Sequence, residues 1–286
     1  MERFVIALGF FDSLHIGHMS LLEKTKALAL ELKAEPLALT FDDDFFPVLN
    51  KDIKQVFTLW ERQELLKKVG VRAFVAASKD VFLLTGNAFL SYLKSLGVVG
   101  IVAGEDYRYG HMAASDIKDL SLFCKENNIK LIVAPTIMQE GRKISSSSIR
   151  ELLTIGDIAK VNALLGREYT ITGKVKSGRG EGRKMGLPTA NIYTPTIKHL
   201  PKEGVYRTYT LVDGKRYDSV TSVGGQPTFE SSVFSVETLI IGFSGNLYDN
   251  IITVGFLNWM REMIKFNSKE ALIEQISMDI EEAKNG

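Results

Sequence analysis

The chain has 286 residues, about twice the ~150 residues of a typical domain, so two domains of moderate size are expected. Its apolar fraction of 45% and charged fraction of 24% are typical of globular proteins and exclude a chain that is disordered, collagen-like or coiled coil throughout. Thirty-five basic residues against 34 acidic residues leave a net charge of +1, without the basic excess of a dedicated nucleic-acid-binding protein. Any phosphate binding must therefore be local.

The single cysteine, Cys124, can form neither an internal disulfide nor a structural zinc site, and no motif surrounds it. We expect a cytoplasmic protein in which Cys124 is a buried helix residue. The first apolar run, residues 4–9, is too short to span a bilayer and lacks a small-residue cleavage site after it, so it is expected to be a buried strand. No other apolar run approaches the ~18 residues of a membrane span.

Up to about residue 165, short apolar runs alternate with amphipathic segments. The runs lack period-two alternation, which is typical of parallel strands buried on both faces. They cover residues 4–9, 37–41, 73–77, 98–104 and 129–135. The segments between them are expected to be helices with one apolar face, over residues 18–34, 59–69, 88–96 and 115–126. This alternation predicts an α/β domain with a doubly wound parallel sheet, which binds ligands beyond the carboxyl ends of its strands.

Beyond about residue 168, strand-like runs follow one another, separated by Gly, Asp-Gly and Ser-Gly turns. They cover residues 170–176, 204–212, 215–223, 233–243 and 251–256. One terminal helix is expected after an N-cap at Ser268, with Leu272, Ile273, Ile276 and Ile280 as its apolar stripe. Short strands in series with one helix predict a small β-barrel domain. We place the domains at residues 1–167 and 168–286.

Two of the chain's four histidines, His15 and His18, lie three residues apart where the first strand passes into the first helix. A helix N-terminus offers unpaired N–H groups and a partial positive charge, which suit a phosphate. Two imidazoles there can donate hydrogen bonds to phosphoryl oxygens as charge develops, and Gly17 allows close approach of a ligand to the backbone. We expect Gly9, Phe11 and Gly17 to help bind the phosphate-bearing ligand. A pair of surface histidines that cap a helix is the alternative.

This His-x-Gly-His pattern resembles the nucleotidylyltransferase superfamily, which transfers a nucleotidyl group from ATP or CTP to a phosphate. That superfamily usually carries a second signature, a Ser/Thr-rich turn with a basic residue at a helix start. Residues 143–150 read Lys-Ile-Ser-Ser-Ser-Ser-Ile-Arg in the corresponding place. Hydroxyls, backbone N–H groups and a planar guanidinium can hold a triphosphate. We therefore expect Lys143, Ser146, Ser147 and Arg150 to converge with the histidines on one triphosphate, although the serines alone could form only a flexible cap.

A glycine-rich stretch at residues 178–186 precedes a Pro-Thr-Ala-Asn sequence. The glycine spacing predicts a loop that covers phosphates, with Gly178 and Gly186 among its ATP-binding residues. Thr189 and Asn191 offer a hydroxyl and an amide to Mg²⁺ and to phosphate oxygens. A glycine-rich loop alone is often only a hairpin, but Gly-Leu-Pro-Thr-Ala-Asn at residues 186–191 closely resembles the riboflavin kinase motif.

Together the two halves resemble the bacterial bifunctional riboflavin kinase/FAD synthetase family over nearly the whole chain. Further runs fall in family order at residues 104–110, 200–206, 224–229 and 236–238. The resemblance implies that the first domain adenylylates FMN with ATP to give FAD, and that the barrel phosphorylates riboflavin with ATP and Mg²⁺ to give FMN. It also implies that Glu237 is the general base of the kinase and that Asp106, Tyr107 and Arg261 contact the flavin. The expected partners are small molecules, with no nucleic acid and no membrane, and no oligomeric state is indicated.

The sequence departs from the family pattern at several positions. Ser13 stands where the family usually has glycine, and Asp42-Asp43-Asp44 replaces part of a Glu-Pro-His-Pro sequence. The aspartates could bind Mg²⁺ or form a solvated loop. In the barrel, the residues after Glu237 lack a histidine often found there, Gly255 stands where Glu is usual, and Met263 replaces an acidic residue near the flavin.

These departures remove polar groups from the presumed flavin pocket of the kinase, whereas the adenylyltransferase signatures are intact. We therefore expect the protein to have FAD synthesis as its better-supported activity and the kinase activity to be weak or absent. Two alternatives stay open at this point. One is a nucleotidylyltransferase that acts on another phosphate substrate, and the other is a non-enzymatic flavin or nucleotide sensor.

Overall fold

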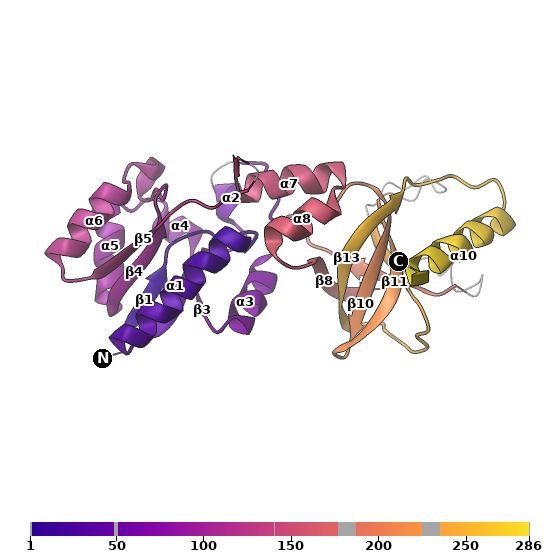
Figure 1. Cartoon of the computed structure of the whole chain (residues 1–286), viewed down its shortest axis with the longest axis horizontal. Helices are drawn as coiled ribbons and strands as arrows, with labels where there is room; N and C mark the ends of the chain where they lie inside the picture. Colours follow the sequence, from indigo (N-terminus) through magenta and orange to yellow (C-terminus); the bar gives the residue numbers. More distant parts are fainter. Residues whose placement is uncertain (1, 49–50, 140, 177–186, 225–234, 286) are drawn as a thin grey trace. The chain divides into compact units, whose positions relative to one another are not determined.

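The computed structural model describes residues 2–48, 51–139, 141–176, 187–224 and 235–285. Its contacts divide the chain into two compact units, Met1–Ser146 and Ser147–Gly286 (Figure 1). The expected fold class is confirmed: the first unit contains a parallel sheet with helices, and the second contains an antiparallel barrel and a terminal helix.

The first unit is built on a five-stranded parallel sheet in the order β3-β2-β1-β4-β5. The strands are β1 (Phe4–Ala7), β2 (Glu35–Phe41), β3 (Arg72–Ala76), β4 (Val98–Gly104) and β5 (Lys130–Ala134). Because β1 lies between β2 and β4, the chain leaves β1 on one side of the sheet and returns on the other. The crevice at the carboxyl ends of β1 and β4 is therefore the expected ligand site.

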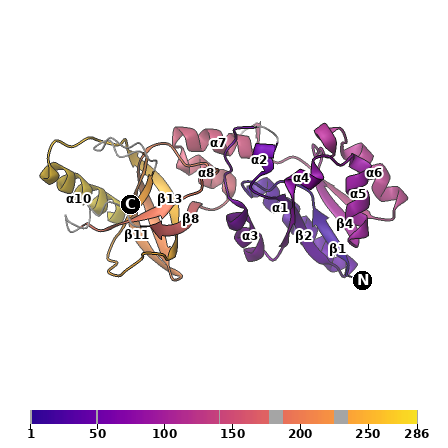
Figure 2. The same cartoon turned by 180° about the vertical axis from the view of Figure 1, so that it is seen from behind.

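Two helix layers cover this sheet (Figures 1 and 2). One layer contains α1 (Ile16–Leu32) and α3 (Leu59–Lys68), and the other contains α5 (Gly86–Ser95) and α6 (Ile117–Glu126). Alternate residues of β1 face the two layers: Val5 packs with Leu28 of α1, whereas Ile6 packs in the cluster that contains Phe89 of α5. This two-sided burial explains why the strands read as continuous apolar runs.

Cys124 lies on α6 with 2% of its surface exposed, as expected. Burial raises the pKa of its thiol to about 11, so the thiol stays protonated near neutral pH.

The short elements of the first unit were not predicted. They are α2 (Phe45–Val48), α4 (Ser78–Val81), the 3₁₀ turn His111–Ala113, and the hairpin of β6 (Met138–Gln139) and β7 (Arg142–Lys143).

The second unit contains a closed antiparallel barrel in the order β10-β11-β12-β9-β8-β13. Its strands are β8 (Tyr169–Lys176), β9 (Thr189–Tyr193), β10 (Gly204–Val212), β11 (Lys215–Gly224), β12 (Ser235–Ile240) and β13 (Ile251–Arg261). Helices α7 (Ser146–Ile155) and α8 (Ile158–Leu165) group with this barrel. Asn162 of α8 accepts from the backbone N–H of Tyr169 at 2.7 Å and donates to the carbonyl of Phe256 at 2.9 Å. The domain boundary between residues 167 and 168 stays a prediction.

Five fully buried hydroxyl groups form a closed ring of hydrogen bonds inside the barrel. The Oγ–Oγ distances are 2.8 Å for Thr208–Ser219, 2.9 Å for Ser219–Thr210, 3.3 Å for Thr210–Thr238, 3.0 Å for Thr238–Thr221 and 2.7 Å for Thr221–Thr208. Each hydroxyl can donate one bond and accept others, so the ring satisfies polar groups that would be costly to bury alone. It joins β10, β11 and β12 from within.

The terminal helix α10 (Lys269–Asn285) begins at its predicted N-cap, where the Oγ of Ser268 accepts from the N–H of Ala271 at 3.2 Å. An ion pair joins it to the end of β13: Arg261 donates to Asp279 through Nε at 2.9 Å and Nη2 at 2.6 Å, and Asp279 is 3% exposed. Of the predicted stripe, Ile280 packs in an apolar cluster with the barrel, whereas Ile273 is 36% exposed. Among the helices of the described ranges, none is long and apolar enough to cross a membrane.

Candidate active sites

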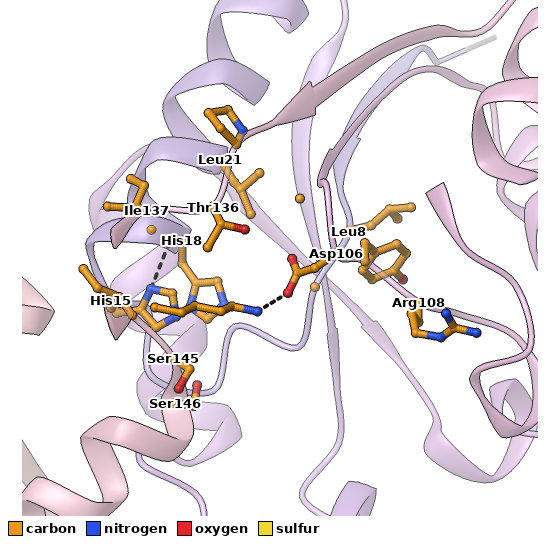
Figure 3. Close-up of a pocket in the computed structure, with 17 residues that line it drawn as sticks. Leu8, His15, His18, Leu21, Asp106, Arg108, Thr136, Ile137, Ser145 and Ser146 are labelled. Atoms are coloured by element: carbon orange, nitrogen blue, oxygen red, sulfur yellow. Dashed lines mark hydrogen bonds and ion pairs between the residues drawn. The ribbon is translucent and has the colours of Figure 1, made fainter. Parts of the chain in front are cut away.

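A pocket of about 300 Å³ lies in the first unit, at the carboxyl ends of β1, β4 and β5. Segments far apart in the sequence line it, and eight of the predicted site residues are among them. These are Gly9, His15, Gly17, His18, Asp106, Tyr107, Lys143 and Ser146 (Figure 3). The structure thus brings the His-x-Gly-His motif and the first part of the Ser-rich signature, residues 143–146, together at the place where the sheet topology predicts a ligand.

The two histidines form one stacked unit at the start of α1. Their ring centroids are 3.8 Å apart with an interplanar angle of 10°, and the ring of Phe11 lies 5.0 Å from that of His18. His15 is the N-cap residue, and its Nδ1 accepts from the backbone N–H of His18 at 3.2 Å (Figure 3). Because Nδ1 accepts, a neutral His15 carries its proton on Nε2 and can donate from there. His15 therefore caps the helix and also lines the pocket.

Phe11 is fully buried and is not among the residues that line this pocket. Its φ of 56° places it in the left-handed region, which turns its side chain into the core beneath the histidines. Its ring packs against His18, and its contact with ATP stays a prediction.

The second signature is divided between the two units. Ser146 begins α7 and its Oγ lies 2.9 Å from the Oγ of Ser13, within the first unit. Ser147 and Arg150 belong to the second unit, where Nη2 of Arg150 donates to the Oγ of Ser147 at 3.3 Å. The convergence of Arg150 with the histidines therefore stays a prediction.

Lys143 forms an ion pair with Asp106 across the pocket, drawn as a dashed line in Figure 3. The carboxylate holds the ammonium group at the pocket wall, where a phosphate could compete for it. The neighbouring Tyr107 stacks on Tyr109, with ring centroids 5.8 Å apart, and burial raises the pKa of Tyr107 well above its usual value. The Tyr107 phenol is therefore neutral. Flavin contacts by Asp106 and Tyr107 stay predictions.

Two of the three consecutive aspartates, Asp42 and Asp43, bind protein groups through their side chains. Asp42 accepts from the backbone N–H of Ser78 at 3.0 Å and from its hydroxyl, and Asp43 accepts from the N–H of Leu59 at 2.8 Å. Asp43 also pairs with Arg62 at 3.5 Å. Within the described part of the chain, no group of three His, Cys, Asp or Glu residues could hold a metal ion. Asp42 and Asp43 thus fix the loop after β2 to the starts of α3 and α4.

Sequence reasoning missed Arg62, whose side chain is fully buried on α3. Its guanidinium donates to Gln55 at 3.1 Å and lies 4.6 Å from the ring centroid of Phe10. Burial lowers the pKa of Arg62, and the charges of Asp12 and Asp43 oppose that shift. Arg62 therefore supports Phe10, the residue that follows Gly9 at the pocket.

Phe10 is part of an aromatic cluster at the carboxyl ends of β1 and β2, which the sequence analysis also missed. Phe10 stacks on Phe45 with centroids 4.3 Å apart and meets Phe46 edge to face at 5.2 Å. Phe41 and Phe82 complete the cluster. The signal was present in the sequence, since phenylalanines follow both strands, but it was not used.

The second unit has its own pocket of about 690 Å³ beside β9, lined in part by Pro188, Thr189, Phe243 and Tyr248. The Thr-Ala-Asn sequence forms strand β9, which was not predicted as a strand. Glu237 of β12 lies directly opposite Asn191 in the antiparallel register, and Leu239 lies opposite Thr189. Opposed residues share a face, so Thr189, Asn191 and Glu237 lie on the same face of the barrel wall.

That face is the outer one, because the neighbouring Thr238 points into the barrel and joins the hydroxyl ring. Glu237 is half-buried, and its Oε1 accepts from the hydroxyl of Ser235 at 3.4 Å. Gly178 and Gly186 lie outside the described residues. Arg261, expected at the flavin, is engaged by Asp279 of α10, and its flavin contact stays a prediction.

The departure at Gly255 has a packing reason. Gly255 lies opposite Tyr209 in the pairing of β13 with β10, and a Cβ atom at position 255 would lie 2.2 Å from the Tyr209 ring. The guanidinium of Arg216 lies 3.7 Å from the centroid of the same ring. Tyr209 therefore occupies the space that a larger residue at 255 would need. Met263 likewise packs in the apolar cluster between the barrel and α10, which suits its apolar side chain.

We expect the substitution Gly255→Glu, which restores the residue usual in the family, to destabilise the protein by about 1–3 kcal/mol through overpacking. Urea unfolding followed by circular dichroism measures this loss. Combining it with Tyr209→Ala should restore part of the stability, because the two side chains compete for one space. An unchanged unfolding midpoint for Gly255→Glu would contradict this packing explanation.

Comparison with known proteins agrees with the geometry. The family model described as FAD synthetase matches residues 1–148, and that described as riboflavin kinase matches residues 165–286. A crystal structure described as a macrolide-efflux protein from Streptococcus pneumoniae covers 100% of this chain and 95% of its own, with a TM-score of 0.88 and 28% identity.

Three relatives are each described as a bifunctional riboflavin kinase/FMN adenylyltransferase. That of Listeria monocytogenes is 32% identical, covering 98% of this chain and 91% of the relative. That of Bacillus subtilis is 31% identical with the same coverage of 98% and 91%, and that of Escherichia coli K12 is 27% identical over 97% and 91%. The two family models together match most of the chain, and these relatives align with nearly all of it; the chain therefore belongs to the bifunctional riboflavin kinase/FMN adenylyltransferase family.

Proposed function

We propose that this protein makes FAD by transferring AMP from ATP to FMN in the pocket of the first unit, and that its barrel phosphorylates riboflavin to FMN. The observation that carries the first activity is the stacked pair of His15 and His18, in the same pocket as Lys143 and Ser146. A nucleotidylyltransferase for another phosphate substrate would leave the barrel without a role. A cytoplasmic location fits the single, buried cysteine.

In adenylyl transfer, the nucleophile is the FMN phosphate, which is already an anion and needs no general base. One of its oxygens forms a bond to the α-phosphorus of ATP, and the bond from that phosphorus to the bridging oxygen breaks. Pyrophosphate leaves with the electron pair. The site must align these groups and stabilise their charge.

The residues of the pocket suit that task. His15 can donate from Nε2, His18 and Ser146 can donate to phosphoryl oxygens, and the ammonium of Lys143 can neutralise the leaving pyrophosphate. Arg150 would add a bidentate contact to the triphosphate. Gly9 and Gly17 leave the backbone accessible to the nucleotide.

In the kinase reaction, the nucleophile is a neutral ribityl hydroxyl, so a carboxylate helps by taking its proton as the bond to the γ-phosphorus forms. The bond from that phosphorus to the β,γ-bridging oxygen breaks, and ADP leaves with the electron pair. Glu237 is our candidate for this base. The hydroxyl of Thr189 and the amide of Asn191 lie on the same face of the wall and are oxygen ligands suited to Mg²⁺, which commonly completes its shell with water and nucleotide phosphates. When bound, Mg²⁺ would neutralise phosphate charge. Gly178 and Gly186 would cover those phosphates.

We expect FMN formation from riboflavin to be slower than FAD formation from supplied FMN, because Gly255 and Met263 replace polar groups of the family pattern. The test incubates the protein with Mg-ATP and either riboflavin or FMN, and separates the flavins by chromatography. Equal rates would contradict the weak kinase. If supplied FMN gives no FAD, the adenylyltransferase proposal is wrong and the sensor alternative takes its place.

A further inference from the structure

Ser13 connects the two adenylyltransferase signatures. It is fully buried, and its Oγ lies 2.9 Å from the Oγ of Ser146, 133 residues further along the chain. Ser146 lines the pocket beside the histidines (Figure 3), whereas Ser13 is not among the lining residues. This hydrogen bond therefore gives Ser13 a route to a ligand in the pocket through Ser146.

The backbone fixes the position of Ser13 before a ligand arrives. Its neighbour Leu14 has a φ of 48°, and the preceding Asp12 accepts from the backbone N–H of Val56 at 2.9 Å through Oδ1. His15 then caps α1. The turn is held at both sides, so the Ser13 hydroxyl is presented to Ser146 without a further loss of backbone freedom.

The direction of this hydrogen bond matters for an anionic ligand. Each serine hydroxyl has one proton to donate and lone pairs to accept. If Ser13 donates to Ser146, the proton of Ser146 is available to point into the pocket. The reverse direction would turn the lone pairs of Ser146 toward the pocket, where they would repel phosphate. Hydroxyls in a chain also polarise one another, so the first donor strengthens the second.

We propose that Ser13 is a positioning residue for adenylyl transfer: it donates to Ser146 and thereby directs the Ser146 proton toward a phosphate of ATP. This inference rests on the proposed FAD synthesis. It assigns a role to a residue at which this chain departs from the family's usual glycine, which has no hydroxyl to donate.

The test is a double-mutant cycle in the FAD-forming reaction, with Ser13→Ala, Ser146→Ala and the double variant. We expect Ser13→Ala to lower kcat/KM for ATP by about fivefold, the size of one ordinary hydrogen bond, and to leave the KM for FMN unchanged. In the Ser146→Ala background, Ser13→Ala should have no further effect on ATP, because the hydrogen bond through which we propose that it acts is already lost. Ser95→Ala, which removes a hydroxyl bonded to the Tyr92 carbonyl at 2.7 Å, is the control and should leave both constants unchanged.

Ser13→Gly provides a second variant, since the family usually has glycine there, and it should weaken the use of ATP as Ser13→Ala does. An unchanged kcat/KM for ATP in both variants would overturn the inference while FAD synthesis by the wild type stood. Effects of Ser13→Ala and Ser146→Ala that multiply would also overturn it, because Ser13 would then act independently. A wild type that makes no FAD would refute the proposed function, and this inference with it.

Discussion

Replacement of His18 by alanine should lower the rate of FAD formation from FMN and ATP by about 10²-fold or more. The His18 ring lines the pocket, stacks on His15 and contacts the tilted ring of Phe11, so its orientation is set before the nucleotide binds. A preorganised donor acts mainly on the charge that develops during transfer. The loss should therefore appear in both kcat and kcat/KM, which steady-state assays of FAD and pyrophosphate would show.

Two further variants separate chemistry from packing. His18→Phe retains a ring that can stack but has no hydrogen-bond donor, so this variant should form FAD as slowly as His18→Ala. If phenylalanine restored the rate, His18 would act only through packing. His111→Ala is the matched control, because His111 is exposed, bonds to the Phe82 carbonyl at 3.0 Å and does not line the pocket. It should keep the wild-type rate. A small effect of His18→Ala would remove His18 from the mechanism.

The strands of the first unit could be predicted because burial on both faces makes them continuous apolar runs, as in β1 and β4. Strand β9 was missed for a physical reason. It follows a Gly- and Pro-containing stretch and reads Thr-Ala-Asn-Ile-Tyr. What makes it a strand is its pairing with β8 and with β12, which lies far away in the sequence. Local sequence does not show such pairing.

The same distinction applies to the site. His15 and His18 could be predicted because their spacing and place after a strand carry the signal. The partners of charged and hydroxyl groups could not, since they depend on which surfaces meet: Ser13 with Ser146, Asp43 with Arg62, and Arg261 with Asp279. Phe11 shows a further limit, because the sequence does not show that its φ is positive and its side chain fully buried.

A substitution in the barrel should lower a reaction rate by as much as His18→Ala does, and it tests the second activity independently of the first unit. Glu237→Gln should lower FMN formation from riboflavin and Mg-ATP by about 10²-fold or more, because the amide cannot accept the ribityl proton. Glutamine keeps the size of the side chain and can still accept from Ser235, so the wall should stay intact. Chromatographic separation of FMN and FAD measures both activities in one sample.

Asp218→Asn is the matched control for this substitution. Asp218 is an exposed residue on β11, and its known bond to Ile241 uses the backbone carbonyl, so the amide should leave the kinase unchanged. The Thr238 hydroxyl next to Glu237 in the chain holds β12 to β10 and β11, so the strand that carries the carboxylate is fixed within the barrel. FAD formation from supplied FMN should therefore stay at the wild-type rate in Glu237→Gln. If both activities fell together, Glu237 would support folding rather than proton transfer, and if neither fell, another group would have to be the base.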